Sequence, residues 1–133
     1  MLKKTIKFVD YNDVERTEDF YFNLSKAELS EMELETPGGF AAMLQRITAA
    51  QDTPSLVKIF KELILRAYGE KSDDGRRFIK SKELSEAFSQ TEAYSELFME
   101  LATNAEAASA FINGIVPAEI AKQASKEIEH KKN

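Results

Sequence analysis

The sequence predicts an α+β protein that is mainly α-helical, with an N-terminal β-hairpin followed by a bundle of about six to seven short helices. Within residues 1–24, apolar and polar side chains alternate as they do in half-buried strands, on both sides of the turn-forming Tyr11-Asn12-Asp13. After this region the apolar residues recur at helical spacing, between capping residues, glycines and prolines. The 133 residues fit one domain, with the hairpin in 1–24, helices over 25–129 and a frayed tail over 130–133.

The two predicted strands flank the turn. The first covers Thr5–Tyr11, which is rich in β-branched and aromatic residues. The second covers Val14–Leu24, where Phe20 and Phe22 form the apolar end of one face. An isolated hairpin is only marginally stable in water, so we expect this one to pack on helices or to pair with another chain. An exposed strand edge here would be a natural docking point.

Each predicted helix follows a start signal or an apolar stripe. Ser25-Lys26-Ala27-Glu28 is a capping box, in which the Ser25 hydroxyl accepts from the Glu28 N–H and the Glu28 carboxylate reaches back. Thr53 and Pro54 favour the start of another helix, for which Gly69 is well placed as the C-cap. The predicted helices are Lys26–Leu34, Phe40–Ala50, residues 54–68, three short helices capped by Ser81, Thr91 and Asn104, and Ala118–His130.

Composition narrows the classes of partner. The net charge is −5, from 23 acidic and 18 basic residues, and a field of this sign repels phosphate backbones. No apolar stretch is long enough to span a bilayer. We therefore expect neither a nucleic acid nor a membrane as partner. The chain has no cysteine, which rules out disulfides and thiolate nucleophiles.

No residue pattern is typical of catalysis or of cofactor binding. The single histidine, His130, lies in the polar tail, where no partner would orient it. The polar loop Glu70–Lys80 contains Asp73-Asp74-Gly75, but a calcium loop that began at Asp73 would need glutamate where Leu84 stands. A small hairpin closed at Asp74-Gly75 fits this loop better. We therefore expect no enzyme activity, no catalytic or metal site and no cofactor, and a protein that acts by contact.

The contact residues are expected among the aromatic side chains. The chain has nine phenylalanines and four tyrosines, and apolar residues at helical spacing are core by default. A groove between short helices could nevertheless receive the apolar anchors of a partner helix. The candidate contact residues are Phe88, Tyr94, Phe98 and Phe111 in the helical region, with Phe20 and Phe22 in the hairpin as residues that could pair copies of the chain. The same side chains could instead be buried core.

Two long segments carry a resemblance to a known family. Residues 11–34, YNDVERTEDFYFNLSKAELSEMEL, and residues 85–117, SEAFSQTEAYSELFMELATNAEAASAFINGIVP, resemble the tail assembly chaperones of long-tailed bacteriophages and prophages. The resemblance covers nearly the whole chain. It implies a small protein with an N-terminal β-element and a helical remainder. It also implies binding to the long helical tape measure protein, which the chaperone keeps soluble while the tail tube polymerises around it.

The resemblance also sets expectations about partners and location. The tape measure protein is the first expected partner, the major tail tube protein is a second candidate, and self-association of several copies on one tape measure is compatible with the family. The protein would act in the bacterial host cytoplasm and be absent from the mature virion. The alternative function is a virion structural or head–tail joining protein that stays in the particle. Lys131-Lys132-Asn133 can be encoded AAA-AAA-AAC, a slippery run that would permit the programmed frameshift common in the family.

Overall fold

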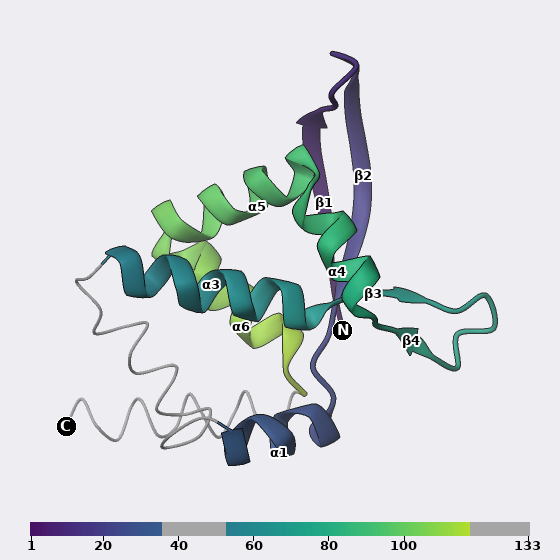
Figure 1. The fold of residues 1–133 in the computed structure, drawn as a ribbon, viewed down its shortest axis with the longest axis vertical. Coiled ribbons are helices and arrows are strands. Elements are labelled where there is room, and N and C mark those ends of the chain that lie inside the picture. The colour runs from purple at the N-terminus through teal and green to yellow at the C-terminus, as the bar shows by residue number, and fades with distance from the viewer. Residues whose placement is uncertain (36–52, 118–133) are drawn as a thin grey trace.

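The computed structural model describes residues 1–35 and 53–117, which form an α+β fold (Figure 1). An antiparallel N-terminal strand pair and five helices make up most of the described residues. The elements are β1 (Leu2–Val9), β2 (Glu15–Phe22), α1 (Lys26–Glu35), α3 (Thr53–Ala67), β3 (Tyr68–Lys71), β4 (Phe78–Ile79), α4 (Lys82–Ser89), α5 (Glu92–Thr103) and α6 (Ala105–Ile115).

The predicted fold class and the N-terminal hairpin are confirmed, whereas the helix count differs. The described residues contain five helices, against about six to seven predicted for the whole chain. Two predicted helices, Phe40–Ala50 and Ala118–His130, lie outside the described residues, as does the tail 130–133. The division of a single domain into hairpin, helices and tail stays a prediction.

The hairpin is regular and its turn is held by hydrogen bonds. β1 and β2 pair in one unbroken register from Leu2↔Phe22 to Val9↔Glu15. The Asp10 carboxylate accepts the Asn12 and Val14 amides at 2.8 and 3.0 Å. Asp13 has a φ of 61°, a left-handed conformation that Asp tolerates better than most residues. In Figure 1 the turn end of the hairpin extends beyond the helices as an arm.

The sheet has two more strands than the predicted N-terminal hairpin. Its order is β1-β2-β3-β4, because α3 ends at Ala67 and the chain then pairs with β2 through Tyr21↔Gly69 and Phe22↔Tyr68. The predictions that Tyr68 is helical and that Gly69 is a C-cap were therefore wrong. A Cβ on Gly69 would lie 2.7 Å from the Phe78 ring, so glycine permits close strand approach here.

The small hairpin at Asp74-Gly75 is confirmed, since it joins β3 to β4. Gly75 has a φ of 72°, a conformation that glycine adopts without strain. The Asp74 carboxylate accepts from the Ser72 hydroxyl at 2.7 Å and from the Arg76 amide at 3.0 Å. Asp74 therefore orders a turn, as the sequence predicted.

The predicted caps at the starts of the C-terminal helices are confirmed. Ser81, Thr91 and Asn104 each accept a hydrogen bond from a backbone N–H in the first turn of α4, α5 and α6. These caps satisfy donors that would otherwise lack partners, and each is typically worth about 1 kcal/mol. α5 contacts β1 and packs with α3 and α6, so the core lies between the lower part of the hairpin and the helices.

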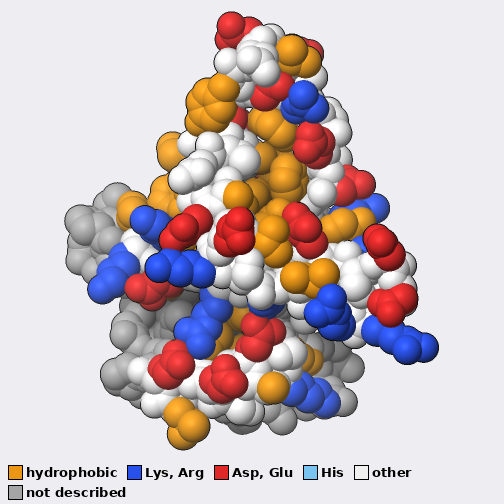
Figure 2. Space-filling model, turned by 45° about the vertical axis from the view of Figure 1, so that its right-hand side comes forward, with side chains coloured by type: hydrophobic (Ala, Val, Ile, Leu, Met, Phe, Trp, Pro, Cys, Tyr) orange, Lys and Arg blue, Asp and Glu red, His pale blue; other side chains and the backbone are white. Residues whose placement is uncertain are grey.

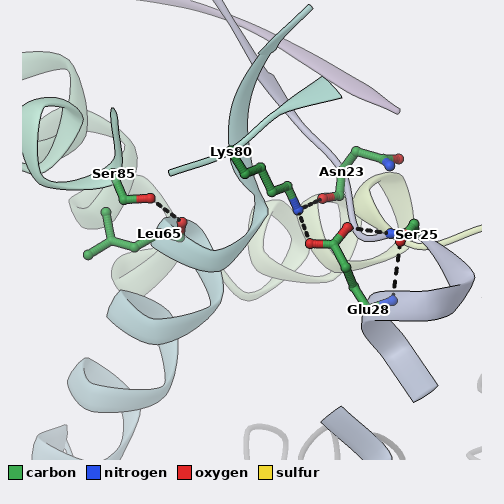
Figure 3. Close-up of polar contacts among 6 residues, drawn as sticks. All are labelled: Asn23, Ser25, Glu28, Leu65, Lys80 and Ser85. Carbon is green, nitrogen blue, oxygen red and sulfur yellow. Dashed lines mark hydrogen bonds and ion pairs between the residues drawn. The ribbon is translucent and has the colours of Figure 1, made fainter. Parts of the chain in front are cut away.

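A half-buried polar clasp, formed by Asn23, Ser25, Glu28 and Lys80, joins the hairpin exit, α1 and the residue that follows β4 (Figure 3). The Lys80 ammonium donates to the Asn23 carbonyl at 2.6 Å and to the Glu28 carboxylate at 2.5 Å. The predicted capping box is formed too, with Ser25 N–H to Glu28 at 3.0 Å and Glu28 N–H to the Ser25 hydroxyl at 3.2 Å. Burial raises the pKa of Glu28, but the hydrogen bonds from Lys80 and Ser25 outweigh it, and the net pKa is lowered.

Candidate partner-binding surface

Aromatic rings from both halves of the chain meet in one continuous cluster. Neighbouring rings are in contact, with centroid separations from 4.2 Å for the stacked Tyr68–Phe88 pair to 6.2 Å for Phe8–Phe20. Such pairs add about 0.5–1.5 kcal/mol each beyond the apolar area they bury. The aromatic cluster consists of Phe8, Phe20, Phe22, Tyr68, Phe88, Tyr94, Phe98 and Phe111.

All six aromatic residues selected from the sequence belong to this cluster, but their exposure divides them. Phe22, Phe88 and Phe111 are 0%, 3% and 2% exposed. In this conformation they form the base of the cluster and offer no surface to a partner. The half-buried members pack on this base from the outside, and we call them the aromatic rim: Phe20, Tyr94 and Phe98.

Local structure explains why the rim lies where it does. Tyr94 and Phe98 are four residues apart on α5, so they lie on one side of the helix, with ring centroids 6.0 Å apart. Phe88, at the end of α4, touches Tyr94 at 5.8 Å and Phe20 of β2 at 5.3 Å. The buried Phe88 ring therefore connects the helical and hairpin parts of the rim.

The opposite side of α5 fixes the helix to the hairpin by polar contacts. Lys4 of β1 forms an ion pair with Glu100 at 2.8 Å. Near the turn, a hydrogen bond to the Glu92 carboxylate raises the pKa of the Tyr11 phenol. Because residues two apart on a helix differ by about 200° in direction, these acids lie away from Tyr94 and Phe98. Among the described residues, the rim side of α5 has no such polar link to the hairpin.

The rim and its base are uncharged at neutral pH. Burial raises the pKa of Tyr94 above its usual value. Burial, followed by the nearby charge of Glu70, raises the pKa of Tyr68 as well. Both phenols thus stay protonated, and the cluster presents apolar ring surface with neutral hydroxyl groups. Figure 2 shows apolar side chains exposed between the hairpin and the body of the molecule, with charged side chains around them.

Neither a metal-binding group nor a membrane-spanning helix is found in the described part of the chain. Residues 1–35 and 53–117 contain no group of three or more His, Asp or Glu side chains placed to hold a metal ion. None of the described helices is long and apolar enough to cross a membrane. His130 lies outside the described residues.

Two members of the cluster were not selected from the sequence. Phe8 was assigned to the first strand without a role, although its alternation with polar neighbours placed it on the inner face. Tyr68 continued the apolar spacing of α3 and was therefore assigned to that helix. The following Gly69 was the signal that could have indicated a strand, because glycine in a strand often marks close approach of another backbone.

Comparison with known proteins identifies a family. A family model described as phage tail assembly chaperone matches residues 1–133. No curated protein and no solved structure matches the chain.

Proposed function

The chain belongs to the phage tail assembly chaperone family, and on this premise we propose that it binds the tape measure protein, keeps it soluble and promotes assembly of the tail tube around it. The observation that carries the proposal is the aromatic rim, three half-buried rings on a buried aromatic base. We propose that this rim contacts the tape measure protein in the host cytoplasm and that the chaperone leaves before the virion is complete.

The arrangement of the rim suits recognition of a helix. Apolar anchors spaced three to four residues apart on a partner helix would lie against Tyr94 and Phe98, which have the same spacing on α5. Aromatic side chains lose little conformational entropy on binding, and a rigid base keeps that loss small. The net charge of −5 keeps the chaperone itself soluble while it covers an aggregation-prone partner.

Self-association and contact with the tail tube protein belong to the same proposal. Several copies would be needed to cover a long helical partner, and release would follow when tube subunits replace them. Phe22 contributes neither to self-association nor to contact with the tail tube protein in this conformation, because it is fully buried. Of the two hairpin residues selected for pairing copies, only Phe20 retains exposed surface.

The test is co-expression with the tape measure protein encoded beside this chain, followed by fractionation and pull-down. We expect the tape measure protein to become soluble and to co-purify, and we expect Tyr94→Ala combined with Phe98→Ala to reduce the co-purified amount at least tenfold. Met99→Ala is the matched control, because Met99 is 56% exposed on the same helix and outside the aromatic cluster. Circular dichroism would check that each variant is folded.

A tape measure protein that stays insoluble would contradict the proposal, provided that a longer frameshift product, if the gene encodes one, fails as well. Equal loss of binding in the rim variant and in Met99→Ala would refute the rim as the site. Mass spectrometry of purified virions tests whether the chaperone leaves before the virion is complete. Finding the chain there at the copy number of a structural protein would favour the virion component instead.

A further inference from the structure

One edge of the hairpin arm is a preformed strand edge, and hydrogen-bond parity shows which residues it contains. The Asp10 N–H donates to the Val14 carbonyl at 2.9 Å, so this pair is a hydrogen-bonded pair of the antiparallel ladder. Hydrogen-bonded and non-hydrogen-bonded pairs alternate along an antiparallel ladder. The even-numbered residues of β2 therefore point their backbone N–H and C=O groups toward β1. The odd-numbered residues of β2 point theirs away from β1.

The lower part of this outer edge is occupied by the next strand. The Asn23 N–H donates to the Ala67 carbonyl at 2.8 Å, and Tyr21 pairs with Gly69. Asn23 and Tyr21 are both odd-numbered residues, whose backbone groups point away from β1. Above Tyr21, β3 leaves β2 and pairs with β4 instead, and Figure 1 shows both strands turning away from the arm. The backbone groups of Glu15, Thr17 and Asp19 thus have no backbone partner among the described residues.

The outer edge of β2 differs from the outer edge of β1. α5 packs along β1, and the exposed Lys3 and Lys7 stand on that strand. Edge lysines and a covering helix are common ways to keep a strand from pairing. Residues 15–19 of β2 carry no lysine, no proline and no bulge, and all five are exposed. This stretch spans roughly 14 Å, enough for a short added strand.

Charge indicates what kind of strand would fit. The side chains of Glu15, Thr17 and Asp19 share one exposed face, so an added strand would meet two carboxylates with a threonine between them. The one basic residue in this stretch, Arg16, is on the other face, where Asp10 and Glu18 neutralise it. Opposite charges directly across a strand pair are stabilising and like charges are not.

We propose that the outer edge of β2 at Glu15–Asp19 binds an extended basic segment of a partner protein by strand addition. The segment would place lysine or arginine opposite Glu15 and Asp19, with a β-branched residue opposite Thr17. β1 has the composition of such a strand, since Lys3, Thr5 and Lys7 share one face of it, and on the other edge of β2 it pairs with Lys7 opposite Thr17 and Thr5 opposite Asp19. This surface is distinct from the aromatic rim and does not depend on it.

The probe for the test is a synthetic peptide with the sequence of β1, LKKTIKFV. Amide hydrogen exchange in the full chain is measured by NMR with and without excess peptide. We expect exchange of the Glu15, Thr17 and Asp19 amides to slow at least tenfold, with little change at Arg16 and Glu18, which are already paired. The control peptide LEETIEFV has the same pattern with the charges reversed and should have no effect.

Two variants sharpen the test. Glu15→Lys should abolish the slowing, because it places like charges opposite one another. Thr17→Pro removes the central outward N–H without removing a bond to β1, and proline is tolerated at such edge positions. If the NMR spectrum of Thr17→Pro shows that the hairpin itself is disturbed, the amide exchange of Glu15→Lys tests the proposal without it.

Several outcomes would overturn the proposal. One is the same slowing with both peptides, and another is no slowing with either. If the three amides are already protected without peptide and the protection rises with protein concentration, a second copy occupies the edge. Protection that does not depend on concentration would mean that the chain covers its own edge. Tape measure binding by Glu15→Lys reports separately on the aromatic rim and should be unchanged.

Discussion

The two halves of β2 have opposite roles although they form one continuous strand. From Phe20 to Phe22 the strand is half-buried and then fully buried, pairs with β3 as well as β1 at Tyr21 and Phe22, and contributes to the aromatic cluster. From Glu15 to Asp19 every side chain is exposed, and β1 is the strand that pairs with it. Burial of the lower half fixes the arm, and the upper half can therefore carry polar side chains and an outer edge that has no strand partner among the described residues.

The largest effect is expected from a truncation in the lower half. Phe22 is fully buried and touches Tyr68, Phe88 and Phe111, so Phe22→Ala would leave a cavity at the centre of the cluster. We expect a loss of about 3–5 kcal/mol in the free energy of unfolding. Thr17→Ala in the upper half should change it by less than about 0.5 kcal/mol. Urea unfolding of both variants measures the two losses, and equal losses would contradict the different roles of the two halves of β2.

The next largest effect is expected at Gly69, where β3 pairs with the lower half of β2. A Cβ at Gly69 would meet the Phe78 ring at 2.7 Å and the Ile79 carbonyl oxygen at 2.8 Å. Gly69→Ala should therefore separate β3 from β4 and cost about 1–3 kcal/mol. Gly75→Ala is a useful contrast, because no atom lies within 4 Å of its Cβ and the cost there arises from its positive φ alone. Thermal unfolding of the two variants would show whether the cost at Gly69 is steric.

The hairpin arm and the pairing of β3 with β2 differ in how far they could be predicted from the sequence. Alternation and turn residues are local signals, and they predicted the arm, its turn and the helix caps. The pairing of β3 with β2 joins Tyr21 to Gly69 across a long stretch of chain. Locally, Tyr68 continues the helical spacing, and the glycine after it suits a helix C-cap as well as a strand. The aromatic residues of the site could be selected by type, but which of them stay half-exposed depends on tertiary packing that no local pattern encodes.

The clasp below the arm should make stability depend on pH. The pKa of Glu28 is lowered in the folded state, so its stabilising contribution is present above the pKa of the unfolded chain and is lost as the pH falls through the folded pKa. Lys80→Met removes the main partner that lowers this pKa, and we expect a loss of about 1–3 kcal/mol near pH 7. The loss should shrink in acid, where Glu28 is protonated in both proteins. Unfolding measured across acidic pH would contradict this account if the difference between wild type and Lys80→Met stayed constant.

The smallest effect is expected at the turn of the arm, where the upper half of β2 begins. The Asp10 carboxylate accepts two backbone amides and pairs with Arg16, and the hydrogen bond from Arg16 is the main reason that the pKa of Asp10 is lowered. Asp10→Asn keeps an acceptor for the amides but removes the charge, so global stability should barely change. Local opening should increase instead, because the turn depends on these contacts and not on burial. Faster amide exchange at Asn12 and Val14, with unchanged exchange at Phe22, would show that the arm opens independently of the lower half. Equal acceleration at all three amides would mean that the hairpin opens as one unit, and the two halves of β2 would then not differ in local stability.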